Sequence, residues 1–150
     1  MDLYSAMRVA GSGLEVQRSR LNVTAQNLAN TNTTQTPEGG PYRAKQLVVE
    51  TEAGGRQGSF EAALQGFSGG GVDPQQARVQ AIRENDDPPR MVYEPDHPHA
   101  NDDGYVAYPD IDRSTQMVDM MEASRAYQAN ATTVSAARNM ALRALQIGRG

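Results

Sequence analysis

The sequence contains no cysteine and no tryptophan, and only two of its 150 residues are phenylalanine. Without cysteine, the chain can form neither disulfide bonds nor thiolate metal sites. Large aromatic side chains dominate the energetics of most cores and interfaces, so an aromatic content of 5% predicts a small core and thin interfaces. The chain has the length of one ordinary domain but few large side chains with which to build one.

The chain also lacks a basic cluster and a long apolar run. Its formal net charge is -4 and its only lysine is Lys45, which argues against nucleic acid as a partner because phosphate binding needs a concentrated basic face. No segment approaches the roughly 18 apolar residues of a membrane span, so membrane insertion is not expected. The amino terminus has neither the apolar run nor the cleavage site of a signal peptide, so any export is expected to proceed without cleavage.

The first thirty residues contain a regular apolar repeat. Met7, Leu14, Leu21 and Leu28 follow one another at seven-residue intervals. This spacing predicts a long helix with one narrow apolar seam, the width that a partner helix covers. Gly11 and Gly13 are unfavourable inside a helix. They indicate a close neighbour, a helix completed by binding, or a break into two shorter helices.

A matching repeat occurs at the other end of the chain. Met120, Tyr127, Val134 and Ala141 have the same seven-residue spacing within a helix expected over residues 112–147. The two seams predict an α+β fold in which long N- and C-terminal helices pair as an antiparallel coiled coil around a small β-rich middle insert. The helical assembly domain is expected to comprise residues 1–36 and 110–150.

The middle of the chain, residues 37–109, reads as a β-rich or irregular insert. After a turn-rich segment at 37–45, short strands are expected at 46–50, 77–83, 90–93 and 105–108. Residues 54–71 contain seven glycines and little periodicity. We therefore expect a mobile loop over residues 54–75, with a short helical turn at 61–64.

One polar segment resembles a metal site in composition. Its oxygen and imidazole ligands could hold a divalent cation: Asp96, His97, His99, Asn101, Asp102 and Asp103. The spacing does not fit a calcium loop, because His99 would occupy the first ligand position and Asp110 the last. A hydrolase using His97 or His99 would also need an activated nucleophile, and no such motif accompanies them. We favour a solvated turn, and predict no catalytic, cofactor or metal site.

Polar amides lie beside both seams. Buried amides fix the register of helix pairs, so four of these residues are predicted as polar assembly contacts: Asn22, Asn27, Asn30 and Asn130. The methionines of the last helix could line a groove for a peptide, but packing is the commoner role of methionine at helical spacing.

Four stretches resemble one protein family. The segments SGLEVQRSRLNVTAQNLANTNTT (12–34), TPEGGPYRAK (36–45), DGYVAYPDID (103–112) and DMMEASRAYQANATTVSAARNMALRALQIG (119–148) are similar to the bacterial flagellar axial proteins, and most specifically to their rod proteins. The resemblance covers both ends and most of the middle of the chain, and residues 54–75 lie outside it.

The resemblance implies a non-enzymatic structural subunit of the proximal rod, the drive shaft that crosses the periplasm and encloses the export channel. It implies secretion by the flagellar type III apparatus without signal cleavage. Expected partners are copies of the chain, other rod subunits, components on the side of the MS ring and export gate, and the rod-assembly cap. The alternative is a soluble helical adaptor that binds one partner at fixed stoichiometry.

Overall fold

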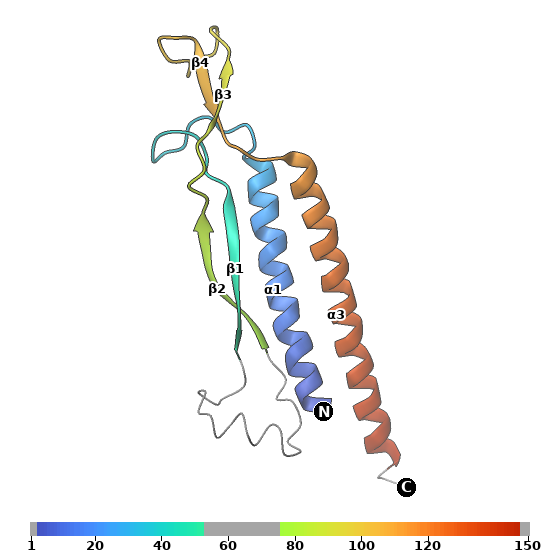
Figure 1. Ribbon diagram of the computed structural model, residues 1–150. Helices are drawn as coiled ribbons and strands as arrows, with labels where there is room; N and C mark the ends of the chain where they lie inside the picture. The colour runs from blue at the N-terminus through green and yellow to red at the C-terminus, as the bar shows by residue number, and fades with distance from the viewer. Residues whose placement is uncertain (1–2, 53–75, 148–150) are drawn as a thin grey trace, which may run out of the picture. The chain divides into compact units, whose positions relative to one another are not determined.

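The computed structural model describes residues 3–52 and 76–147. Its elements follow one another in the order helix, strands, helix (Figure 1): α1 (Leu3–Ala29), β1 (Lys45–Glu52), β2 (Gln76–Glu84), β3 (Arg90–Tyr93), β4 (Tyr105–Tyr108) and α3 (Arg113–Ile147). Each predicted helix and strand is present within a few residues of its expected bounds, which confirms the α+β class. The mobile loop predicted at 54–75 and the helical turn at 61–64 lie outside the described residues.

Helix α1 runs without a break through Gly11 and Gly13. It ends where Asn and Thr side chains bind the last carbonyl groups of the helix. The Thr31 hydroxyl donates to the carbonyl oxygens of Leu28 (2.7 Å) and Asn27 (3.2 Å), and the Asn30 amide donates to that of Gln26 (2.8 Å). The backbone amides of Asn30 and Thr31 also donate to the carbonyl oxygens of Gln26 (3.1 Å) and Leu28 (3.5 Å). The polar run after Leu28 thus adds side-chain donors to the last carbonyl groups of α1.

Helix α3 begins at an N-cap. Asp112 accepts hydrogen bonds from the Ser114 amide (2.9 Å) and the Thr115 hydroxyl (2.8 Å). These two bonds, the one from Thr115 first, lower the pKa of the Asp112 carboxyl. The charged carboxylate also lies at the positive end of the helix dipole.

The two helices pack antiparallel to each other (Figure 1). The Asn27 amide on α1 donates to Gln116 Oε1 on α3 at 3.1 Å. Gly13 on α1 lies against Asn130 on α3, and a Cβ atom at Gly13 would meet Asn130 Nδ2 at 2.8 Å. On α1, Gly13 lies two seven-residue repeats before Asn27. On α3, Asn130 lies two seven-residue repeats after Gln116.

The strands form two separate two-stranded sheets, one of β1 and β2 and the other of β3 and β4. In the second sheet Val92 pairs with Val106 and Tyr93 with Tyr105 in an antiparallel register. Gly104 precedes β4 with a φ of 80°, and a Cβ atom there would lie 2.8 Å from the Tyr93 ring. Glycine is required at this position both by the backbone conformation and by the close approach of the ring.

The core is thin and built from small side chains. Its buried apolar residues, among those described, are Ala10, Val16, Val23, Val106, Ala123 and Ala137. Several large apolar side chains remain exposed on α3 instead: Met117, Val118, Met121, Tyr127, Met140, Leu142, Leu145 and Ile147. The isolated chain therefore leaves much of its apolar surface uncovered, as its low aromatic content predicts.

The chain divides into two compact units, and each long helix contributes to both. The terminus unit contains the first half of α1, through Arg18, and the second half of α3, from Ser124. The insert unit contains residues 19–48 and 81–123, and so holds the second half of α1, the β3–β4 sheet and the start of α3. In the described part of the chain, neither helix is apolar enough over a sufficient length to cross a membrane.

Candidate assembly surfaces

Asn27 is the hub of the insert unit. Its side chain is 3% exposed and uses its full hydrogen-bonding capacity. The amide Nδ2 donates to the Lys45 carbonyl oxygen (2.9 Å) and to Gln116 Oε1 (3.1 Å). The oxygen Oδ1 accepts from the Lys45 amide (2.8 Å) and from the Tyr42 hydroxyl (3.1 Å). One side chain thereby joins α1 to β1, to the segment before β1 and to α3.

Further contacts attach the segment after α1 to distant parts of the insert unit. The Arg113 guanidinium at the start of α3 donates to Asn32 Oδ1. The Thr34 hydroxyl lies 2.8 Å from His99 Nδ1 in the loop between β3 and β4. Tyr42 is partly buried, and this burial, followed by the negative charge of Glu84, raises the pKa of its hydroxyl. The turn-rich segments of the sequence are thus fixed by specific polar contacts.

The predicted apolar seam is half-buried on α1, at all four of its residues. On α3, Met120, Val134 and Ala141 are half-buried, whereas Tyr127 is 39% exposed. In the single chain these side chains are neither fully covered nor fully free. Their role as the assembly seam remains a prediction.

The most deeply buried positions of α3 belong to another repeat. Gln116, Ala123, Asn130 and Ala137 also recur at seven-residue intervals, and Ala123 and Ala137 are 1% and 3% exposed. Gln116 and Asn130 are the two residues of this repeat that approach α1 at Asn27 and Gly13. Sequence reasoning missed this repeat because it selected large apolar residues. Small residues at heptad spacing were the signal that could have identified it.

The four predicted polar contacts occupy different environments. Asn22 is exposed, Asn27 is buried in the hub, and Asn30, just after α1, donates to the carbonyl oxygen of Gln26 on α1. Asn130 is half-buried against Gly13. The Asn27 amide has no hydrogen-bonding group left for a neighbouring subunit, so any effect of this residue on assembly must act through the surfaces that the hub positions.

One buried side-chain atom on α1 is unpaired. Gln17 Oε1 is the only buried side-chain nitrogen or oxygen in the described residues that has no hydrogen-bond partner. A buried acceptor without a partner costs about 1–3 kcal/mol.

The histidine-rich segment forms a hydrogen-bonded turn. The His99 amide donates to His97 Nδ1 (3.1 Å), and Asn101 Oδ1 accepts from the amides of Asp103 (3.1 Å) and Tyr105 (2.8 Å). Over residues 3–52 and 76–147, no three His, Asp or Glu side chains gather closely enough to hold a metal ion. Of the side chains that suggested a metal site, those of His97 and Asn101 accept hydrogen bonds within the turn between β3 and β4.

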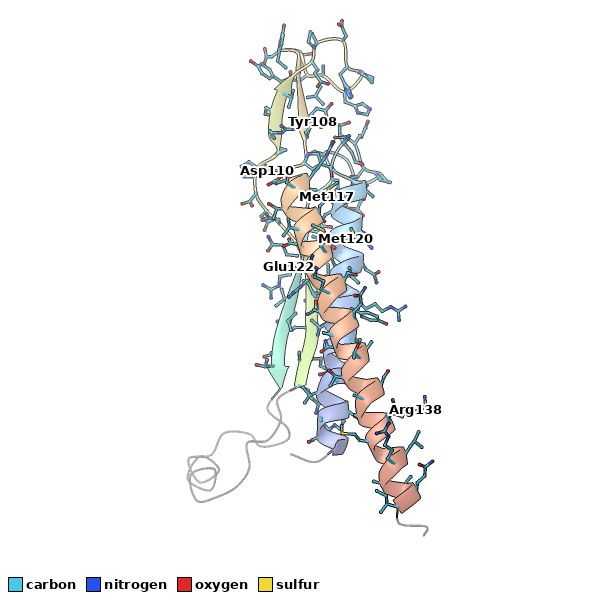
Figure 2. All side chains as sticks on the ribbon, turned by 90° about the vertical axis from the view of Figure 1, so that its right-hand side faces the viewer. Tyr108, Asp110, Met117, Met120, Glu122 and Arg138 are labelled. Atoms are coloured by element: carbon cyan, nitrogen blue, oxygen red, sulfur yellow. The ribbon has the colours of Figure 1, made fainter. Side chains whose placement is uncertain are left out.

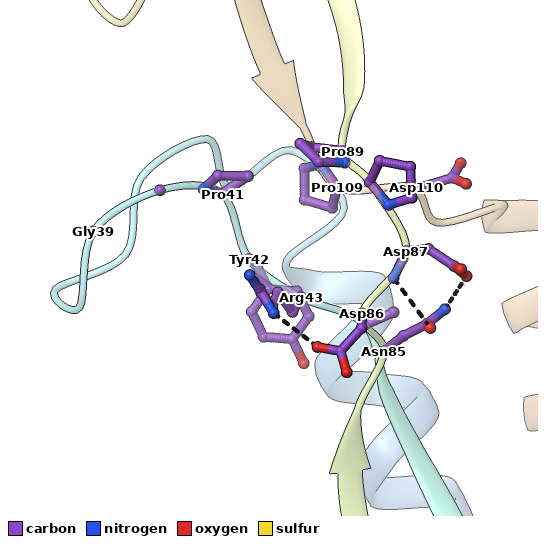
Figure 3. A pocket seen from close by; sticks show the side chains of 13 residues that line it. Gly39, Pro41, Tyr42, Arg43, Asn85, Asp86, Asp87, Pro89, Pro109 and Asp110 are labelled. Carbon is purple, nitrogen blue, oxygen red and sulfur yellow. Dashed lines mark hydrogen bonds and ion pairs between the residues drawn. The ribbon is translucent and has the colours of Figure 1, made fainter.

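A shallow pocket of about 200 Å³ opens beside the Gly39–Gly40 turn (Figure 3). Its rim carries the Arg43–Asp86 ion pair at 2.9 Å, in which both side chains are largely exposed, so the pair contributes little stability. The lining is Gly39, Gly40, Pro41, Tyr42, Arg43, Ala44, Asn85, Asp86, Asp87, Pro88, Pro89, Pro109 and Asp110. This lining contains no Ser, Thr, Cys or His.

Two protein-family models match this chain, one at each end. Residues 7–35 match the family described as "Flagella basal body rod protein", and residues 102–147 match "Flagellar basal body rod FlgEFG protein C-terminal". The chain is 39% identical to the flagellar basal-body rod protein FlgC of Salmonella typhimurium over 149 residues, which cover 99% of this chain and all of that protein. The FlgC proteins of Borreliella burgdorferi and Bacillus subtilis are each 35% identical to the chain, over at least 99% of it and over their full length.

The chain belongs to the FlgC family of flagellar basal-body rod proteins. It is a structural subunit of the basal-body rod, as the resemblance of its terminal segments predicts. The two matched regions contain most of α1 and all of α3, the helices that carry the heptad repeats. FlgC family membership also implies assembly with other components of the basal body.

Proposed function

We propose that the subunit is a non-enzymatic building block of the proximal rod, which transmits torque as a drive shaft and encloses the export channel. The thin core and the exposed apolar residues of α3 support this proposal. They leave surface that heterologous contacts between subunits would cover, and such contacts propagate helically when they do not close into a ring. Torque would then pass through many modest contacts.

In this proposal the two heptad seams complete their packing in the assembled rod. Met7, Leu14, Leu21 and Leu28 face Met120, Tyr127, Val134 and Ala141 in an antiparallel coiled coil. The remaining faces contact copies of the chain, other rod subunits, components on the side of the MS ring and export gate, and the rod-assembly cap. The subunit leaves the cytoplasm through the flagellar export apparatus without signal cleavage.

Leu21→Asp tests this proposal. The substitution places a charge among half-buried apolar side chains, so the free energy of unfolding should fall by about 3 kcal/mol and co-assembly with other rod subunits should be lost. Ala25→Asp, at an exposed position on the same helix, is the matched control. Electron microscopy with the other rod subunits also separates a rod component from an adaptor, because an adaptor complex stops growing. Normal motility with the Leu21→Asp subunit would contradict the seam.

The non-enzymatic part of the proposal can be tested at the histidine turn. Replacing His97 and His99 together with alanine should leave co-assembly intact, because these side chains contact the turn itself, Thr34 and the Tyr108 ring. Elemental analysis of the purified chain should find no stoichiometric metal. A bound metal that both substitutions remove would support a metal-dependent activity instead.

A further inference from the structure

The two histidines of the β3–β4 turn share a hydrogen bond that has only one possible direction. The backbone amide of His99 donates to His97 Nδ1 at 3.1 Å. A backbone N–H group is a donor only, so His97 Nδ1 must accept and carries no proton. The proton of the neutral His97 ring is therefore on Nε2. Both ring nitrogens of a charged imidazolium are donors, so this bond exists only while His97 is uncharged.

His99 connects this turn to a distant segment of the insert unit. Its Nδ1 atom lies 2.8 Å from the hydroxyl oxygen of Thr34, in the segment that follows α1. The Thr34 hydroxyl can donate or accept, so this second bond is compatible with either charge of the His99 ring. The location of that ring depends on the turn, because His97 holds the backbone amide of His99.

The two rings also lie close to each other. The ring centroids of His97 and His99 are 5.3 Å apart, with an angle of 67° between the planes. Two positive charges at this separation repel each other, and the solvent around these partly exposed rings screens the repulsion. Protonation of both rings therefore acts in the same direction as loss of the hydrogen bond.

The charged groups around the histidines are acidic, because residues 91–112 contain no lysine or arginine. The carboxylates of the loop and its first flanking strand are Glu94, Asp96, Asp102 and Asp103. On β4, Tyr108 (Figure 2) has its ring centroid 6.3 Å from that of His97, and its hydroxyl binds Glu94. From the segment after α1, the facing group is the uncharged Thr34 hydroxyl. Histidine is the side chain that ordinarily changes charge between pH 5 and 8, so a pH change in this range acts on the two histidines.

We propose that His97, His99 and Thr34 form a pH-sensitive latch, the histidine latch, which attaches the β3–β4 loop to the segment after α1. While His97 is neutral, its bond to the amide of His99 closes the turn and holds the His99 ring against Thr34. Once His97 is protonated, the imidazolium and the amide are two donors that cannot share a hydrogen bond, so the turn opens and the His99 ring moves away from Thr34. The loop is thus attached above the titration of His97 and released below it. The inference goes beyond the proposed rod function and does not depend on it, because the latch is a property of the folded chain.

NMR of the isotope-labelled full chain between about pH 8 and about pH 5 tests the latch. The ring signals of His97 give its titration midpoint and, at high pH, its tautomer, which should be the Nε2–H form. Protection of the His99 amide against hydrogen exchange, corrected for the intrinsic rate, should fall about threefold or more across that midpoint. The nuclear Overhauser contact between Thr34 and the His99 ring should weaken over the same pH range.

Two substitutions of His97 separate the hydrogen bond from its pH dependence. In His97→Asn, the side-chain oxygen accepts from the amide two residues later, as in an Asx-turn, and it does not titrate. The His99 amide should then be protected, and the contact with Thr34 present, at both ends of the pH range. His97→Ala has no acceptor, so the protection and the contact should be weak at both ends.

Asp96→Asn is the control for the titration of a neighbouring carboxylate, and it should keep the pH dependence of the wild type. Circular dichroism verifies that each variant retains its helices. The latch would be refuted by equal protection of the His99 amide at both ends of the pH range in the wild type. It would equally be refuted by a pH dependence that persists in His97→Asn or disappears in Asp96→Asn. A contact between Thr34 and the His99 ring that survives protonation of His97 would show that the turn does not position the ring, and would overturn the inference.

Discussion

The side-chain amide of Asn27 binds Lys45 as a neighbouring β-strand would. It donates to the Lys45 carbonyl oxygen at 2.9 Å and accepts from the Lys45 amide at 2.8 Å. A side chain of α1 thereby pairs with both backbone groups of the first residue of β1. Its two remaining bonds, to Tyr42 and Gln116, attach the same amide to the preceding segment and to α3.

Asn27→Asp should be strongly destabilising, although the two side chains have the same shape. The substitution removes both donors, leaves the Lys45 carbonyl and Gln116 Oε1 without them, and buries a negative charge. We expect the free energy of unfolding in urea to fall by about 3 kcal/mol. Asn22→Asp, exposed on the same helix, should change it by less than about 0.5 kcal/mol. Equal losses in the two variants would refute the hub.

The two glycines of α1 should respond differently to alanine. A Cβ atom at Gly11 meets nothing within 4 Å, so Gly11→Ala should stabilise the chain by about 0.5–1 kcal/mol through helix propensity. At Gly13 the same atom would lie 2.8 Å from Asn130 Nδ2, so Gly13→Ala should be about 1 kcal/mol less favourable than Gly11→Ala.

Asn130→Ala provides the control for this comparison, because it removes the atom that the new Cβ would meet. In a double-mutant cycle by urea unfolding, Gly13→Ala should be more favourable in the Asn130→Ala background than in the wild type. Additive effects of the two substitutions would show that the helices do not approach each other at this point.

Tyr108 and Glu94 should produce a measurable alkaline titration. The hydrogen bond from the Tyr108 hydroxyl to Glu94 (2.9 Å) is the main cause that raises the pKa of Tyr108 above its ordinary value of 10.0. Glu94→Gln should return this pKa toward 10.0, as measured by NMR of labelled tyrosine. Tyr42, whose pKa is raised by burial and by Glu84, should keep its value and serves as the internal control.

The same pair predicts a pH dependence of stability. Because the pKa of Tyr108 is higher in the folded than in the unfolded chain, its contribution is complete below the unfolded pKa and is lost as the pH rises through the folded pKa. The wild type should therefore lose more stability than Glu94→Gln above about pH 10. Parallel losses in the two proteins would contradict the hydrogen bond.

The N-cap of α3 predicts a contribution to stability that is lost at acid pH, whereas that of Tyr108 is lost at alkaline pH. Asp112→Ala removes the acceptor of the Ser114 and Thr115 bonds, so the melting temperature should fall at neutral pH. The pKa of Asp112 is lowered by folding, so the advantage of the wild type should be present above the unfolded pKa and disappear as the pH falls through the folded one. Asp110→Ala, two residues before Asp112, is the control, and an equal effect there would refute the cap.

The sequence by itself determined the helices, the strands and the family. Heptad spacing, turn residues and the caps around Leu28 and Asp112 act within a few residues, so they can be read along the chain. They placed β3 and β4 at their observed bounds and predicted that the two ends of the chain pair. The four segments of family resemblance predicted the rod assignment that the FlgC relatives support.

Only the tertiary structure decided which repeat of α3 lies deepest and what Asn27 binds. Both repeats of α3 have the same period, and the choice between them depends on the shape of α1, where Gly13 leaves room for Asn130. Asn27 and Gln116 are 89 residues apart in sequence, and no local pattern shows that one amide satisfies both α3 and β1. Burial and saturation of a polar group depend on its neighbours in space, which the order of residues does not specify.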